Sequence, residues 1–140
     1  MKAMEISLSG LDVEWRRLEV IADNLANVNT VKTPDGGPYR AMRLVSGPKT
    51  SFQGHLGSNP ASLDGVAVYG VEPVDTPPRK VHEPGNPMAD ADGNVSYPDI
   101  NHSAEMVLMV KTSRAYEANL VAMNAARTMY VKALDMGRSS

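Results

Sequence analysis

The sequence predicts a mainly α-helical protein, in which long N- and C-terminal helices pack as a coiled-coil-like pair around a small β-rich, turn-rich insertion. The first observation is where the helix breakers fall: all ten prolines lie between Pro34 and Pro98, and nine of the eleven glycines lie between Gly36 and Gly93. The second is that apolar residues at both ends recur in alternating steps of three and four. That is the heptad spacing of a helix that lays one stripe along a partner.

These observations divide the chain into three parts. Residues 1–33 hold the N-terminal helix and the residues that end it, residues 34–98 form the turn-rich middle with short strands, and residues 99–140 form the long C-terminal helix. We expect the first and third parts to make one structural unit. Hydrophobic residues are 42% of the chain but aromatic residues only 5%, a composition that favours helical seams over a bulky core.

The N-terminal helix is predicted from its apolar stripe, which is Met4, Leu8, Leu11, Trp15, Leu18, Ala22 and Leu25. Gly10 and the serines beside it weaken the first turns. Asn27, Asn29 and Thr30 are expected to end the helix, because short polar side chains compete for backbone hydrogen bonds.

The middle of the chain has turn signals and short runs with strand character. Gly36 and Gly37 can take positive φ in a turn, and Asp92-Gly93 is a hairpin signal. Strands are predicted at 39–45, at 65–74 (the most valine-rich run), at 79–83 and at 95–97. Residues 46–65 are predicted to be a loop.

The C-terminal helix is predicted from a run without proline between Asp99 and Gly137. One stripe is Met106, Met109, Ser113, Tyr116, Leu120, Met123, Arg127, Tyr130 and Leu134. A second, mostly small stripe, suited to close approach by another helix, is Leu108, Thr112, Ala115, Asn119, Ala122, Ala126, Met129, Ala133 and Met136. Asn101 is the expected N-cap, Glu105 favours the first turn, and Gly137 is placed to stop the helix.

Composition excludes several function classes. The formal net charge is −2, so no electrostatic attraction to nucleic acid or an anionic membrane is expected. The chain has no cysteine, which excludes disulfides and thiolate chemistry. No apolar run is long enough to span a bilayer, so direct membrane insertion is not expected, and no cleavable secretory signal is visible.

No catalytic or metal-binding constellation stands out either. His55, His82 and His102 lie far apart in sequence, and none has a second ligand at helical spacing. Residues 90–94 resemble part of a calcium loop, but the acidic first ligand and the bidentate Glu of an EF-hand are missing, so a β-turn is predicted there. We expect no enzyme and no cofactor.

Several runs resemble a known family. Ser9-Gly10-Leu11 and the run IADNLANVNT at 21–30 look like the N-terminal signature of the bacterial flagellar rod, hook and hook-associated proteins. TPDGGPYR at 33–40, the turn-rich run at 84–98 and SRAYEAN at 113–119 are similar to the proximal rod proteins of that family. Matches therefore cover nearly the whole chain.

The resemblance implies a structural subunit of the flagellar proximal rod, a drive shaft that transmits torque and encloses the export channel. It implies helical assembly with other copies and with the rod proteins FlgB, FlgF and FlgG, and with FliE. It further implies export by the flagellar type III apparatus without a cleaved signal peptide, and a place in the basal body, within the periplasmic space. The alternative is a freestanding helical adaptor or export chaperone that binds a partner helix.

An assembly interface is predicted along the helical stripes and the asparagines that follow the first one. Its predicted residues are Leu8, Leu11, Trp15, Leu18, Ala22, Asn24, Leu25, Asn27, Asn29, Met106, Met109, Tyr116, Leu120, Met123, Arg127, Tyr130 and Leu134. Arg127 interrupts an apolar stripe. It is expected either to pair with an acid of the N-terminal helix such as Glu14 or Glu19, within the subunit or between neighbouring subunits, or to extend its guanidinium into water along the seam. Because a lone helical hairpin leaves one stripe uncovered, both ends are expected to be mobile in the free monomer and ordered on assembly.

Overall fold

The described part of the chain forms two long helices and four short strands. The computed structural model describes residues 2–49 and 64–138. In chain order the elements are α1 (Lys2–Ala26), β1 (Met42–Pro48), β2 (Val66–Pro73), β3 (Arg79–His82), β4 (Asn94–Tyr97) and α3 (His102–Arg138). This confirms the predicted fold class.

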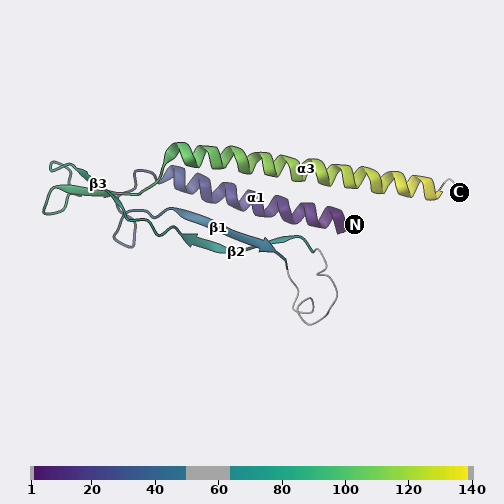
Figure 1. Ribbon diagram of the computed structural model, residues 1–140, viewed down its shortest axis with the longest axis horizontal. Helices are drawn as coiled ribbons and strands as arrows, with labels where there is room; N and C mark the ends of the chain where they lie inside the picture. The colour runs from purple at the N-terminus through teal and green to yellow at the C-terminus, as the bar shows by residue number, and fades with distance from the viewer. Residues whose placement is uncertain (1, 50–63, 139–140) are drawn as a thin grey trace, which may run out of the picture.

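The elements form an elongated, layered molecule. Figure 1 shows α3 along one side of α1 and the two-stranded sheet β1–β2 along the other side. The second hairpin, β3–β4, projects from the end where α1 finishes and α3 begins. Among residues 2–49 and 64–138, the buried apolar side chains are all aliphatic, and they are Leu11, Val13, Ile21, Ala41, Leu44 and Val95.

The two helices run antiparallel, and α3 is the longer, with 37 residues against 25. Their register is fixed by three close pairs: Gly10 with Asn119, Trp15 with Tyr116, and Asn24 with Glu105. By this register the start of α1 lies beside residue 127. The remaining residues, 127–138, extend past α1 and are all exposed (Figure 1); we call this segment the α3 overhang.

The helix ends follow the sequence signals with one exception. The Asn101 side-chain oxygen accepts the Ala104 N–H at 3.0 Å, as predicted for an N-cap. α1 ends at Ala26, where the Asn27 amide donates to the Asp23 carbonyl at 2.8 Å. The expectation that Gly137 stops α3 is wrong, because α3 continues to Arg138. One glycine costs a helix only about 1 kcal/mol and no proline follows it.

The sheet β1–β2 is antiparallel and contains a bulge. Pairing runs from Met42 opposite Pro73 to Pro48 opposite Val66, with a register shift after Val45 that leaves Tyr69 without a cross-strand partner. The Tyr69 ring lies over Gly47, where an added Cβ would come within 2.7 Å of it, and its hydroxyl donates to the Pro48 carbonyl at 2.6 Å.

The strand predictions were right for the later strands and displaced for the first. Runs 65–74 and 79–83 contain β2 and β3, and run 95–97 covers all of β4 except its first residue, Asn94. The first strand is Met42–Pro48 rather than 39–45, so the predicted loop begins too early, and residues 50–63 of that loop lie outside the described residues. β1 extends to Pro48 because it pairs with β2 as far as Val66, even though Pro48 itself has no N–H to donate to the ladder.

The turn at 90–94 is a backbone-bonded turn, as predicted. One Asp90 carboxylate oxygen accepts the N–H groups of Asp92 at 3.0 Å and Asn94 at 2.8 Å, and Gly93 takes a φ of +76°. These bonds, above all the one from Asn94, lower the pKa of Asp90. In residues 2–49 and 64–138, no three His, Asp or Glu side chains group as metal ligands.

In the described part of the chain, neither α1 nor α3 combines the length and the apolar character needed to cross a bilayer.

Candidate assembly interface

The seam between α1 and α3 is close because small residues face each other across it. A Cβ added to Gly10 would lie 2.7 Å from the Asn119 side-chain oxygen, so only glycine fits there in this packing. Leu108, Thr112 and Asn119 are at least half-buried along the seam. The first half of the small stripe, from Leu108 to Asn119, therefore makes the predicted close approach, whereas Met129, Ala133 and Met136 at its other end are exposed.

The other stripe of α3 lies at the margin of the seam and faces outward. Met109, Tyr116 and Met123 are half-buried, whereas Met106, Leu120, Tyr130 and Leu134 are exposed. More apolar side chains on the outer surface of α3 add to this face, and they are Val107, Val110, Val121, Met129 and Val131. An exposed apolar face of this length is typical of surfaces that bind a partner.

A shallow groove on α1 carries the largest exposed aromatic side chain. Trp15 is 55% exposed and Leu8 59%, and the Trp15 ring lies 6.2 Å from that of Tyr116. The groove, about 560 Å³ in volume, is lined by Glu5, Leu8, Ser9, Leu11, Asp12, Trp15 and Tyr116; we call it the Trp15 groove. Exposed tryptophan bordered by polar groups is typical of binding surfaces.

A buried polar cluster joins α1, β1 and α3. The Asn24 amide pairs with the Met42 backbone as a strand would, its oxygen accepting the Met42 N–H at 2.8 Å and its nitrogen donating to the Met42 carbonyl at 2.9 Å. The same nitrogen donates to Glu105 at 3.2 Å, and Tyr39 donates to the Asn24 oxygen at 3.2 Å. The other Glu105 oxygen forms an ion pair with Arg43.

The centre of this cluster is sealed from solvent, whereas Arg43 at its edge is partly exposed. Asn24 is 0% exposed and Glu105 2%, and among the described residues no buried side-chain nitrogen or oxygen lacks a partner. Burial, followed by the nearby negative charges of Asp23 and Glu105, raises the pKa of Tyr39. Because an unpartnered polar group in such a site is costly, the cluster fixes the register of the three elements.

The asparagines predicted for the assembly interface serve mainly within the chain. Asn24 has no exposed surface, so its assignment to the interface is corrected. Asn27 is half-buried, and its side chain bonds to Asp23 and Thr30 at the end of α1. Asn29 is exposed.

The structure places the other predicted α1 residues at different depths. Leu11 is buried beneath the Trp15 groove, so most of its surface is covered within the chain. Leu18 and Leu25 are half-buried, and Ala22 is exposed. The α1 stripe therefore reaches the surface mainly through Leu8 and Trp15.

Arg127 is exposed at the start of the α3 overhang, beside the beginning of α1. Glu14 and Glu19, its predicted partners, lie well along α1, where they pair with Arg17 at 3.2 Å and Arg16 at 3.8 Å. The expected pairing within the subunit is therefore wrong, because more than ten helical positions separate the groups. A pairing between subunits remains a prediction.

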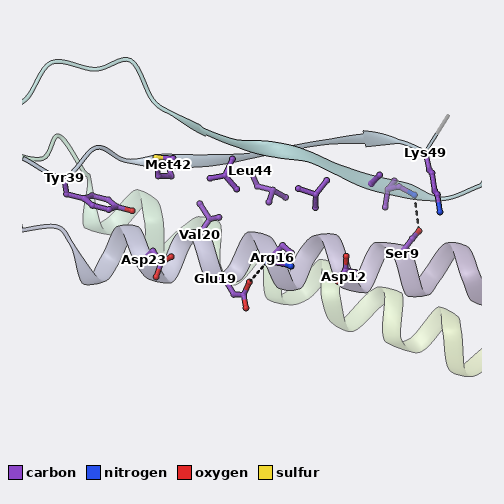
Figure 2. A pocket seen from close by; sticks show the side chains of 14 residues that line it. Ser9, Asp12, Arg16, Glu19, Val20, Asp23, Tyr39, Met42, Leu44 and Lys49 are labelled. Carbon is purple, nitrogen blue, oxygen red and sulfur yellow. Dashed lines mark hydrogen bonds and ion pairs between the residues drawn. The ribbon is translucent and has the colours of Figure 1, made fainter. Parts of the chain in front are cut away.

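Sequence reasoning missed Glu105, Arg43 and Ser9. Glu105 was read only as a favourable charge in the first turn of α3, and its partners are 62 and 81 positions away in sequence. The Ser9 hydroxyl accepts the Val66 N–H at 3.0 Å and ties β2 to α1 (Figure 2). Gly65 allows this approach, because its added Cβ would lie 2.2 Å from that hydroxyl oxygen.

Between α1 and β1–β2 lies a groove of about 730 Å³. Figure 2 shows Val20 and Leu44 facing each other across it, with Asp12, Arg16 and Asp23 along α1. None of its lining residues is a histidine or cysteine. The Ser9 hydroxyl makes structural bonds there, since it donates to the Ile6 carbonyl at 2.7 Å and accepts the Val66 N–H.

Comparison with known proteins agrees with this geometry. Residues 4–31 match a family model described as flagella basal body rod protein, and residues 91–136 match one described as flagellar basal body rod FlgEFG protein C-terminal. These two matches cover α1 and α3.

Curated relatives extend the similarity over nearly the full chain. The flagellar basal-body rod protein FlgC of Salmonella typhimurium is 38% identical over 138 residues, which is 99% of this chain and 98% of the relative. FlgC of Borreliella burgdorferi is 36% identical, covering 94% and 93%, and FlgC of Bacillus subtilis is 33% identical, covering 97% of each. A non-enzymatic, structural role is thereby confirmed, and the chain belongs to the FlgC family of flagellar basal-body rod proteins.

Proposed function

We propose that this rod protein forms part of the proximal rod by helical assembly with further copies of itself and with other rod proteins. In that assembly the outward face of α3 is covered by neighbouring helices. The observation that carries the proposal is the row of exposed apolar side chains along α3, which continues through the α3 overhang.

The same surface suits a shaft that transmits torque around an export channel. A shaft under torsion shares its load among many contacts, and a helix with one covered and one open face offers contacts along its whole length. The β3–β4 hairpin, at the far end from the overhang, would brace adjacent subunits. The partners we propose are FlgB, FlgF, FlgG and FliE. We further propose that the flagellar type III apparatus exports the chain without removing a leader peptide, and that the assembled rod lies in the periplasmic space.

The test replaces the apolar face without touching the fold. The triple variant with Leu120→Gln, Tyr130→Gln and Leu134→Gln should abolish rod completion and swimming, because it removes apolar contacts with neighbouring helices. Each of the three residues is exposed within the chain, so the fold should be unaffected. The matched control on the same helix is Lys111→Gln, Glu117→Gln and Lys132→Gln, three exposed polar residues, and it should swim normally.

The readouts are motility in soft agar and electron microscopy of isolated basal bodies. Circular dichroism of both purified triple variants should match that of the parent chain. Normal rods in cells that carry the apolar-to-glutamine triple variant would refute the proposal.

A further inference from the structure

The α3 overhang presents a face with an apolar centre and basic borders. Tyr130, Val131 and Leu134 are 42%, 47% and 51% exposed. At about 100° per residue, Arg127 and Arg138 fall on this same face, within an arc of about 100°. In the described part of the chain, neither arginine forms an ion pair.

The Trp15 groove has the complementary character. Its exposed apolar surface comes from Leu8 and Trp15, and its charged lining residues are Glu5 and Asp12. Across residues 2–49 and 64–138, neither of these carboxylates pairs with a lysine or arginine. The groove therefore has two carboxylates beside an exposed apolar surface, and the overhang has two arginines beside an exposed apolar surface. The two surfaces are complementary in charge.

The overhang cannot reach the groove of its own chain. The pairing of Gly10 with Asn119 places Leu8 beside residue 121. Leu134 lies 13 positions further along a straight helix, or about 20 Å away at 1.5 Å per residue. Only another molecule can bring the two surfaces together.

We propose that the α3 overhang of one copy docks in the Trp15 groove of a second copy, a contact that rests on the proposed function and specifies one of its interfaces. With the helices antiparallel, as within the chain, Arg127 meets Asp12 and Arg138 meets Glu5. This pairing displaces the second copy by about 12 helical positions, or about 18 Å along the helix axis. The two surfaces differ, so the contact is heterologous and continues from copy to copy as an open, staggered array.

Disulfide crosslinking tests the contact, and the absence of native cysteines makes it clean. A chain that carries Leu8→Cys and Leu134→Cys cannot close a bridge within itself, because a disulfide needs Cα atoms less than about 7 Å apart. In oxidised basal bodies this variant should give a ladder of self-multimers that reductant removes. Leu134→Cys with Val107→Cys, an equally exposed site elsewhere on α3, should give none.

Charge exchange gives a second measurement on exposed residues that are not expected to affect folding. Glu5→Arg with Asp12→Arg, or Arg127→Glu with Arg138→Glu, should each reduce completed rods by about tenfold, because like charges would oppose each other. The variant with all four changes should recover most of that loss.

The outcomes separate this contact from the wider proposal. Motile cells whose double-cysteine chains form no ladder, or crosslink only to a different protein, would overturn docking between copies while the rod role stands. The proposal would also be overturned if the variant with all four charge changes completed no more rods than either double charge variant. A ladder together with charge rescue would establish it.

Discussion

The two helices are covered to different extents. α1 lies between α3 and the sheet β1–β2, and it contributes Gly10, Leu11, Val13, Ile21 and Asn24 to the interior (Figure 1). α3 contributes only Glu105 and Thr112, and its last 12 residues are exposed throughout. The difference shows that α1 holds the fold of the single chain together. Under the proposed function, the exposed surface of α3 is the part of the chain that other chains cover.

Removing the buried amide of α1 should have the largest effect. Asn24→Leu leaves the Met42 backbone and the Tyr39 hydroxyl without their partner in a sealed site, and should reduce the free energy of unfolding by about 3 kcal/mol. Urea denaturation followed by circular dichroism measures it. Asn29→Leu, at an exposed asparagine, is the control and should change stability by about 0.5 kcal/mol or less. Equal urea midpoints for Asn24→Leu and Asn29→Leu would contradict a stabilising role for the buried amide of α1.

Filling the closest point of the seam should have the next largest effect. Gly10→Leu places a side chain against Asn119 and should destabilise the chain by about 2 kcal/mol. Gly137→Ala meets nothing within 4 Å and should instead stabilise α3 by up to about 1 kcal/mol through helix propensity. Thermal unfolding should show a lower melting temperature for Gly10→Leu and a higher one for Gly137→Ala than for the parent chain. Asn119→Ala added to Gly10→Leu should restore part of the loss, because it removes the side chain that blocks the new one.

A pH titration sharpens the comparison at the junction of α1 and β1. The pKa of Tyr39 is raised above its ordinary value of 10.0 by burial and by Asp23 and Glu105. A group whose pKa is raised on folding contributes stability that is complete below the unfolded pKa and is lost as pH rises through the folded value. Stability should therefore fall as pH rises above 10, and less so in Tyr39→Phe. Denaturation midpoints between pH 8 and pH 11 check this, and the same slope in both proteins would contradict it.

The smallest effect on the free chain is expected in the α3 overhang. Val131→Gln should change the free energy of unfolding by about 0.5 kcal/mol or less, because the side chain is already exposed. In the free chain, amides of residues 127–138 should exchange with deuterium much faster than those of 105–119, since only the latter segment packs on α1. The sequence led us to expect that both ends of the free monomer are mobile, whereas this prediction assigns mobility to the C-terminal end of α3 alone. Equal protection of the two segments of α3 would show that the overhang is ordered without a neighbour.

Local patterns were sufficient to predict the helices. The three- and four-residue spacing identified both α1 and α3, and Asn101 marked the start of α3 because its side chain bonds to the nearest turn. The small stripe also identified the side of α3 that approaches α1. Such signals are contained within a few residues and need no knowledge of distant partners.

The long-range contacts were not predictable in the same way. Glu105 has the sequence context of an ordinary first-turn acid, yet it is buried against Asn24 and Arg43. Nothing in the composition of β1–β2 indicated that this sheet would cover the second side of α1. Asn24 was assigned to contacts between subunits because its role within the chain depends on residues far away in sequence.

The buried cluster also sets an order of events for a newly arriving chain. Its members come from positions 24, 43 and 105, so it cannot close until about three-quarters of the polypeptide is present. Until then Asn24 and Arg43 have no acidic partner, and the N-terminal segments lack the contact that fixes their arrangement. A product truncated before Glu105 would lack the acidic partner of Asn24 and Arg43, whereas a full-length chain completes the cluster once α3 packs on α1.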